Sequence, residues 1–314
     1  MKKKSFLSLL FAFNIFCAFS QFTLQGYEDV AKFKKTKMYV VLSDTDAVFN
    51  KYIKEAVTRY WTLTAYDFIP YSKLKENSKD VNKSFMVITG FTAQLGGDPL
   101  LNNTFYNNSV GHPTHGSHIS VTYGTTVLAI IMGGNKLSDY RNWMAFCYGG
   151  YELQGFSSPK VISYVRLLQN TLVTVEKNKL NKLLWSEADK LYNTAEPLTD
   201  KQILFWDKDI PTQKVITAGV GREDKKFLKK SEIEDKFKGK FSIINTEELE
   251  KNVHDSSKTN LFFGTYFEGT FNVIYLYDAG GNVCFFSKMM HNYECTDWFA
   301  LVLRKMDKAF ISKP

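Results

Sequence analysis

The sequence predicts a protein of the α/β (α+β) class, a tandem duplication of a small mixed-sheet domain with helices packed mainly on one face of each sheet. Two observations lead to this prediction. The first is that the chain aligns with itself at a nearly fixed offset of 176 positions. Apolar residues then coincide in the pairs Tyr39 and Val215, Tyr52 and Leu228, Val57 and Ile233, Trp61 and Phe237, and Phe85 and Leu261. The second is that strand-like and helix-like patterns follow one another in the same order in both halves.

The first copy opens with residues 37–42, a β-branched and aromatic run that predicts a buried strand. Asp44 and Asp46 then supply oxygen atoms typical of a helix N-cap, although the same pair resembles a DxD metal motif. From Val48 to Tyr60 the apolar residues recur at helical spacing. The remaining predicted elements are strand 66–69, turn 72–77, strand 84–89, a hairpin over 119–132 that turns at Gly124, and closing helix 161–175.

The second copy repeats this order. Its predicted elements are strand 215–218, helix 223–237, strand 241–244, turn 247–251, strand 261–266, hairpin 271–286 and closing helix 297–310. The hairpin turn, residues 278–282, is rich in glycine, as a tight turn requires. Such an order predicts a sheet that helices cover on one side.

Each copy also carries an aromatic strand followed by a leucine-containing turn. These are residues 65–69 with Leu74, and residues 240–244 with Glu248 and Leu249. Over residues 37–89 and 214–266 this pattern resembles the small α/β domain at the start of TolB and in CsgG-like envelope lipoproteins. The signal-like start and the composition rich in lysine and asparagine resemble exported two-repeat proteins of Bacteroidota. The resemblance implies an interaction role in the cell envelope rather than a reaction.

The first twenty residues predict an export signal. Lys2, Lys3 and Lys4 precede an apolar stretch at 6–16, and the small-x-small pattern at 18–20 marks a cleavage site. That stretch is shorter than the roughly 20 residues that cross a bilayer, so no membrane span is expected. The signal predicts a periplasmic protein, with secretion as the alternative.

Domain boundaries follow from the repeat. The expected division is signal peptide 1–20, repeat 1 over 21–177 with inserts at 94–117 and 133–157, helical linker 178–206, and repeat 2 over 207–314.

Charge and cysteine content exclude some classes of function. Three of the formal +8 charges are lysines of the signal, and lysine and glutamate are mixed elsewhere, so nucleic acid is not an expected partner. No CxxC motif occurs, which excludes a thioredoxin-type redox site and a cysteine-based zinc site. Cys284 and Cys295 either form a disulfide between a strand and the next helix or remain buried thiols.

The two inserts of repeat 1 are the expected functional regions, because long loops in compact domains are usually functional or disordered. Around the first insert, His112, His115 and His118 fall within seven residues. Imidazole is a common metal ligand, so these three residues are the candidate ligands of zinc or a similar ion. The alternative is a polar loop whose histidines bond to water and backbone.

The aromatic residues of the inserts are the candidate partner-binding residues: Tyr106, Tyr140, Trp143, Phe146, Tyr148 and Tyr151. Aromatic residues are enriched, and lysine and glutamate depleted, at the centres of protein interfaces. The alternative is that they pack as additional core.

These patterns favour a non-enzymatic exported protein that docks on another envelope component. An accessory subunit of an outer-membrane export translocon, of the type IX secretion kind, fits by analogy. No catalytic residue is predicted, no cofactor beyond the candidate ion is expected, and the oligomeric state is left open. Two alternatives remain: a metal-binding protein or hydrolase that uses the histidine loop, and a periplasmic binder of a small ligand or glycan that stacks on Trp143.

Overall fold

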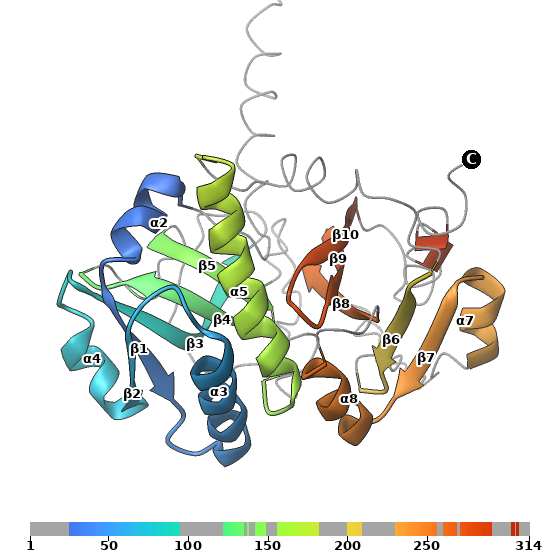
Figure 1. The fold of residues 1–314 in the computed structure, drawn as a ribbon, viewed down its shortest axis with the longest axis horizontal. Helices are drawn as coiled ribbons and strands as arrows, with labels where there is room; N and C mark the ends of the chain where they lie inside the picture. The colour runs from blue at the N-terminus through green and yellow to red at the C-terminus, as the bar shows by residue number, and fades with distance from the viewer. Residues whose placement is uncertain are drawn as a thin grey trace, which may run out of the picture.

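The computed structural model describes residues 25–94, 122–134, 137, 142–148, 156–181, 200–208, 230–255, 260–268, 271–290, 303, 304, 306 and 307. These residues form two α/β lobes that lie side by side (Figure 1). Lobe 1 comprises the described residues up to 181, and lobe 2 those from 200 onward. The predicted signal peptide lies outside the described residues. The prediction of a mixed α/β fold with mixed sheets is confirmed.

Lobe 1 is built on a five-stranded sheet, which we call sheet A, in the order β2-β1-β3-β4-β5. Its elements are α2 (Tyr27–Phe33), β1 (Lys37–Leu42), α3 (Ala47–Tyr60), β2 (Tyr66–Pro70), the 3₁₀ helix η1 (Tyr71–Lys73), α4 (Leu74–Asn77), β3 (Lys83–Gln94), β4 (Thr122–Met132), β5 (Trp143–Tyr148) and α5 (Lys160–Lys177). Strand β1 runs parallel to β2 and β3, whereas β4 is antiparallel to both β3 and β5.

Lobe 2 contains a second five-stranded sheet, which we call sheet B, in the order β7-β6-β8-β9-β10. Its elements are β6 (Gln202–Trp206), α7 (Lys230–Lys236), β7 (Lys240–Ile244), α8 (Thr246–Val253), β8 (Leu261–Glu268), β9 (Phe271–Asp278) and β10 (Val283–Met290). Strand β6 runs parallel to β7 and β8, and β9 is antiparallel to β8 and β10. Residues 303, 304, 306 and 307, within the predicted closing helix, are helical.

Three sequence-based assignments are wrong. The predicted hairpin at Gly124 is instead one strand, β4, in which Gly124 pairs with Thr92 of β3. The third antiparallel strand is β5, which lies inside the supposed second insert at 133–157. Strand β6, which lies between β7 and β8, consists of residues assigned to the helical linker, whereas the strand predicted at 215–218 lies outside the described residues.

Helix α3 illustrates how local sequence sets the fold of lobe 1. Asp46 adopts an extended backbone, and its carboxylate accepts a hydrogen bond of 2.8 Å from the amide of Phe49, which caps the helix. The face that packs on the sheet is apolar, and its buried residues are Phe49, Tyr52, Ile53, Ala56 and Val57. Asp46 therefore acts as the N-cap residue that the sequence predicts.

Helix α5 is buried on more than one side. The six consecutive residues 160–165 are all buried, so every face of its first one and a half turns is covered. A helix that is buried all round belongs to the core rather than to the surface of a domain. One continuous hydrophobic cluster contains Leu168 of α5, Val40 of sheet A and Phe262 of sheet B. Lobe 1 and one part of lobe 2 therefore share a core that passes through α5. The other buried hydrophobic residues of lobe 2 lie outside this cluster: Ile203, Phe205, Ile233, Phe237, Leu276, Phe285, Leu303 and Met306.

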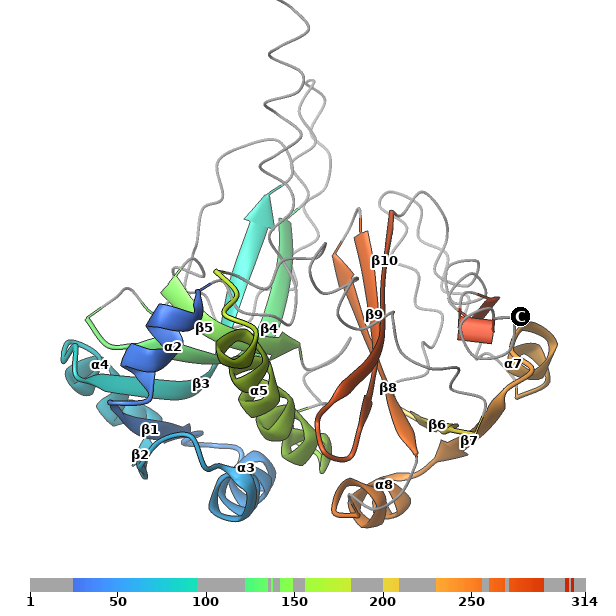
Figure 2. The same ribbon diagram turned by 45° about the horizontal axis from the view of Figure 1, so that its top comes forward.

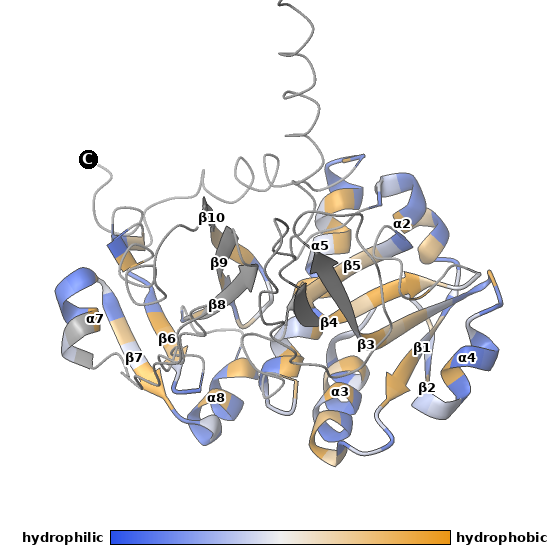
Figure 3. Ribbon diagram, turned by 180° about the vertical axis from the view of Figure 1, so that it is seen from behind, coloured by the Kyte–Doolittle hydropathy of each residue, from blue (hydrophilic) through white to orange (hydrophobic). Residues whose placement is uncertain are grey.

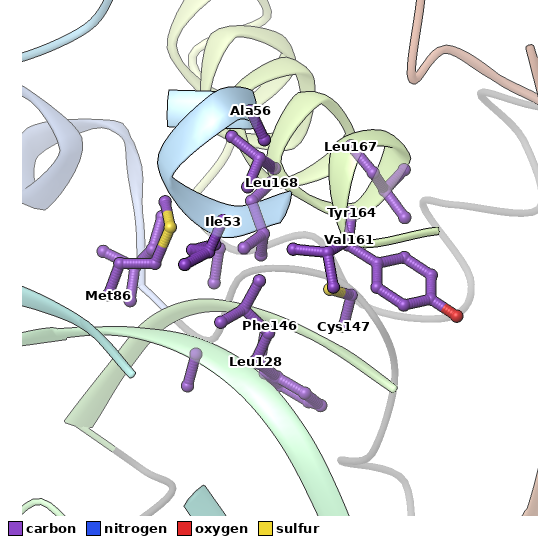
Figure 4. Packing of buried hydrophobic residues seen from close by; sticks show 14 of the residues in the cluster. Ile53, Ala56, Met86, Leu128, Phe146, Cys147, Val161, Tyr164, Leu167 and Leu168 are labelled. Carbon is purple, nitrogen blue, oxygen red and sulfur yellow. The ribbon is translucent and has the colours of Figure 1, made fainter. Parts of the chain in front are cut away.

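The lobe 1 half of this core is a layer of two helices on a sheet. Figure 4 shows Val161 and Leu168 of α5 lying over Leu128 and Phe146 of sheet A, with Ile53 of α3 beside them. Hydropathy follows the same arrangement, because hydrophobic residues concentrate along the strands of sheet A and alternate with hydrophilic residues on α3 and α5 (Figure 3).

The turn between β9 and β10 packs end-on against α5. The side chain of Asn170 donates hydrogen bonds to the carbonyl oxygen of Gly280 at 2.7 Å and to Oδ1 of Asn282 at 3.1 Å. Gly281 has a φ of 78°, and a Cβ added to it would lie 2.5 Å from the carbonyl carbon of Arg166. Only glycine fits this position, because a side chain would strain its own backbone and collide with the helix backbone.

Gly281→Ala should destabilise the protein strongly. The left-handed backbone costs about 1–2 kcal/mol, and the contact with α5 adds to this because backbone atoms cannot move aside. Gly280→Ala is the matched control, since its added Cβ would meet only the ends of the Asn282 and Asp278 side chains, at 3.0 Å. Urea unfolding of both variants checks this, and equal stabilities would contradict the docking of the turn on α5.

Candidate functional site

The long connections of lobe 1 lie at one end of the strands of sheet A. Strand β3 ends there, β4 begins there and β5 ends there, because neighbouring strands are antiparallel. The connection between β3 and β4 spans residues 95–121, whereas that between β8 and β9 consists of residues 269 and 270. The connection between β3 and β4 contains most of the first predicted insert at 94–117. It also contains four candidate residues, all outside the described residues: Tyr106, His112, His115 and His118.

A two-stranded ribbon leads into this connection. We call residues 90–94 of β3 and 122–126 of β4 the β3–β4 ribbon. These residues pair with one another in register from Gly90 opposite Thr126 to Gln94 opposite Thr122. Among the described residues they pair with no other strand, since β1 pairs with β3 only as far as Met86. The ribbon therefore extends beyond the rest of sheet A, as Figure 2 shows.

The prediction that Trp143 and Phe146 bind a partner is wrong. Trp143 is fully buried and Phe146 is 1% exposed, because both lie on β5 inside the core. Their rings pack edge-to-face at 5.4 Å, and the Trp143 indole N–H donates a hydrogen bond to the carbonyl oxygen of Leu137 at 2.9 Å. Trp143 is therefore no stacking surface for a small ligand either.

The other aromatic candidates stay predictions. Tyr140 and Tyr151 lie outside the described residues. Tyr148 is the last residue of β5, and nothing is described of its side chain.

The loop that joins β1 to α3 is held by its own polar side chains. The hydroxyl of Ser43 accepts hydrogen bonds from the amides of Thr45 and Asp46, and Asn50 bonds to both the amide and the carbonyl of Ser43. The hydroxyl of Ser157 donates to the carboxylate of Asp46. In the described part of the chain, no three histidine, cysteine, aspartate or glutamate residues are grouped to hold a metal ion.

A polar cluster joins α3 to α8 at the boundary between the lobes. His254, which ends α8, has its Nε2 3.3 Å from the carboxylate of Glu55 and its Nδ1 3.0 Å from the hydroxyl of Tyr60. A neutral imidazole with its proton on Nε2 satisfies both contacts, since Tyr60 then donates to Nδ1. Such a chain of phenol, imidazole and carboxylate can move a proton, but each member also holds one helix against another.

Arg166 of α5 completes this cluster. Its guanidinium lies 4.4 Å from the ring centre of Tyr60, and burial lowers its pKa, with the nearby Arg59 acting in the same direction. Asp278 of the β9–β10 turn acts in the opposite direction by attraction. Tyr52 extends the contact between α3 and α8, because its hydroxyl donates to Glu250 at 3.2 Å. The cluster thus links three helices and a turn from both lobes.

The two described cysteines are free thiols with little thiolate at neutral pH. Burial raises the pKa of Cys147 well above its usual value and that of Cys284 to about 11. Neither is suited to act as a nucleophile, because the thiolate is the reactive form. Cys295 lies outside the described residues, and Cys284 is a free thiol, which is the second of the two alternatives that the sequence leaves open for this pair.

Comparison with known proteins gives no relative: no family model matches the sequence, and no curated protein and no solved structure matches the chain. The resemblance to the TolB and CsgG-like domains therefore stays a prediction. Within the described ranges, no helix is both long and apolar enough to cross a membrane.

Sequence reasoning missed the cluster at His254 and the ribbon. The cluster could not be found from sequence, since its members are separated by almost two hundred residues and belong to different lobes. The ribbon had a signal, because the uncharged run from Ile88 to Gln94 continues the pattern of β3 beyond the predicted strand 84–89.

Trp143→Ala should cost about 3–5 kcal/mol of stability, because it removes a large, fully buried ring from the core. Val173→Ala, on the exposed side of α5, is the control and should change stability by no more than about 0.5 kcal/mol. Chemical denaturation measures both. If the Trp143→Ala protein is as stable as the control, the burial of the Trp143 ring is contradicted and the residue is again a candidate surface anchor.

Proposed function

We propose that the protein is a non-enzymatic, exported, periplasmic protein of two α/β units. It docks on another component of the cell envelope through the β3–β4 ribbon and the connection that the ribbon carries. An accessory role in an outer-membrane export translocon, of the type IX secretion kind, is the partner class proposed. The export signal and the resemblance to envelope domains support the location.

One observation carries the proposal. Two sheets with the same strand order and the same strand directions differ most in one connection, which spans 95–121 in lobe 1 and 269–270 in lobe 2. The stability of the sheet does not require the long connection, since lobe 2 closes the same hairpin without it. Loops carried by a rigid scaffold are the usual position of binding residues. The long connection is therefore best explained by binding.

We infer that the two units arose by duplication. The amide of Trp61 donates to the carbonyl of Val57 at 3.1 Å, and the amide of Phe237 donates to the carbonyl of Ile233 at 2.9 Å. These four residues correspond at the offset of 176, so equivalent helices end with equivalent buried aromatic rings. The first strand departs from that offset, because β6 lies upstream of the predicted strand at 215–218.

The shared core supports the proposal mechanically. Helix α5 and the polar cluster around His254 join the lobes, so the ribbon is carried on one body rather than on a loosely tethered domain. A rigid base lowers the entropic cost of association, because fewer degrees of freedom are lost when a partner binds.

A chimera tests the proposal. Residues 95–121 are replaced by Gly-Thr, the residues at 269–270 of lobe 2. The free energy of unfolding should change by no more than about 3 kcal/mol, since loop closure contributes only about 0.6 kcal/mol per doubling of loop length and shortening the connection from 27 residues to two is almost four doublings. Envelope proteins crosslinked to the tagged chain in its native cells are then quantified by mass spectrometry. A partner recovered with the wild type should fall at least tenfold with the chimera.

The matched control changes the short connection instead. Replacing Gly269 and Thr270 by Asn-Gly preserves a two-residue hairpin turn in lobe 2 and should leave recovery of the partner unchanged. Equal recovery with the chimera and the wild type would contradict docking through lobe 1.

A further inference from the structure

Two arginine side chains meet at one tyrosine ring at the boundary between the lobes. The guanidinium carbon of Arg166 on α5 lies 4.4 Å from the ring centre of Tyr60, and that of Arg59 on α3 lies 5.4 Å from it. Burial lowers the pKa of Arg166, and the positive charge of Arg59 acts in the same direction, so the two guanidiniums are close enough to repel each other. Arg59 is exposed and Tyr60 is partly exposed, so solvent reaches this place.

The carboxylates near these arginines are engaged with other groups. Glu55 precedes Arg59 by one helical turn, the spacing at which such residues commonly pair, but its carboxylate lies 3.3 Å from Nε2 of His254 instead. The carboxylate of Asp278 accepts hydrogen bonds from the amide and the side chain of Asn282, at 2.9 Å and 3.0 Å. Within the described part of the chain, neither arginine forms an ion pair with a carboxylate.

The N–H groups of both guanidiniums also lack acceptors. Nη1 of Arg166 is buried and has no hydrogen-bond partner among the described residues. Nη1 of Arg59 lies 3.4 Å from Nδ1 of His254, but the hydroxyl of Tyr60 lies closer to the same atom, at 3.0 Å. A neutral imidazole nitrogen has one lone pair, so it cannot accept fully from both groups. Buried donors without an acceptor are costly and need an explanation.

We propose that Arg59 and Arg166 bind a small oxyanion, a phosphate or a carboxylate group, at the boundary between the lobes. An oxyanion supplies the acceptors that both guanidiniums lack, and the planar fork of arginine matches a pair of oxygen atoms. The ring of Tyr60 lies against both guanidiniums and so sets their spacing. His254 holds the carboxylate of Glu55, which would otherwise compete with the ligand for Arg59. The site contains no residue of the β3–β4 ribbon, and binding there does not depend on the proposed docking.

Isothermal titration calorimetry of the mature chain tests this. The probes are inorganic phosphate and acetate, with chloride at the same ionic strength as the reference. At least one oxyanion should bind at one site per chain with a Kd of about 1 mM or lower. Chloride should bind at least tenfold more weakly, because a single atom cannot accept two parallel hydrogen bonds from one guanidinium. Tighter binding of phosphate identifies the natural ligand as a phosphate group, and tighter binding of acetate identifies it as a carboxylate.

Two arginine variants assign the binding to this cluster. Arg59→Gln should keep the fold, because Arg59 is exposed, and should weaken binding of the oxyanion about tenfold or more, since the ligand loses a charged donor. Arg166→Lys keeps the charge but loses the planar fork, and should weaken binding by a similar factor. Arg304→Gln is the matched control, because it removes the same charge from an exposed position of lobe 2 outside this cluster. It should leave the affinity unchanged.

Two results would overturn the proposal. One is that neither phosphate nor acetate binds more tightly than chloride. The other is that the Arg59→Gln and Arg304→Gln proteins have the same affinity for the oxyanion. Binding would then follow the net positive charge of the chain rather than the pair of arginines at Tyr60.

Discussion

The burial of α5 between two sheets is the interaction on which the rest of the structure depends. Eleven of its 18 residues are buried, among them residues from every face of its N-terminal half. Apolar area removed from water is the largest favourable term in folding, and here one helix contributes to the cores of both lobes at once. Exposing either side of α5 would leave an apolar surface that a monomeric domain rarely tolerates.

Polar contacts refine this arrangement rather than create it. The ion pair between Lys51 and Glu250 is largely exposed and adds little, as surface pairs generally do. The contacts of His254 are less exposed and more specific, because one imidazole satisfies both a phenol and a carboxylate of α3. The Asn170 amide and the absence of a side chain at Gly281 then set where the β9–β10 turn meets α5. Burial brings the lobes together, and these contacts fix their relative position.

Local patterns in the sequence predicted those elements whose signal is local. The turn at 278–282, the capping residue Asp46 and the periodic helix α5 all appear near their predicted positions. Strands β5 and β6 were missed although both are continuous apolar runs, Trp-Met-Ala-Phe-Cys-Tyr and Gln-Ile-Leu-Phe-Trp. The reason is that a fixed repeat offset assigned them to an insert and to a linker. A glycine inside a strand, Gly124, was likewise taken for a turn, because local sequence does not reveal that β3 continues beside it.

The central claim, that lobe 1 and one part of lobe 2 share a core through α5, is tested most directly by native-state hydrogen exchange over a series of urea concentrations. The slowest amides of β1 in lobe 1 and of β6 in lobe 2 report the free energy needed to open each sheet. A shared core predicts that both sets converge on one opening free energy, that of global unfolding. If the amides of β6 open at a free energy lower by more than about 1 kcal/mol while β1 stays protected, the lobes unfold separately and the account is contradicted.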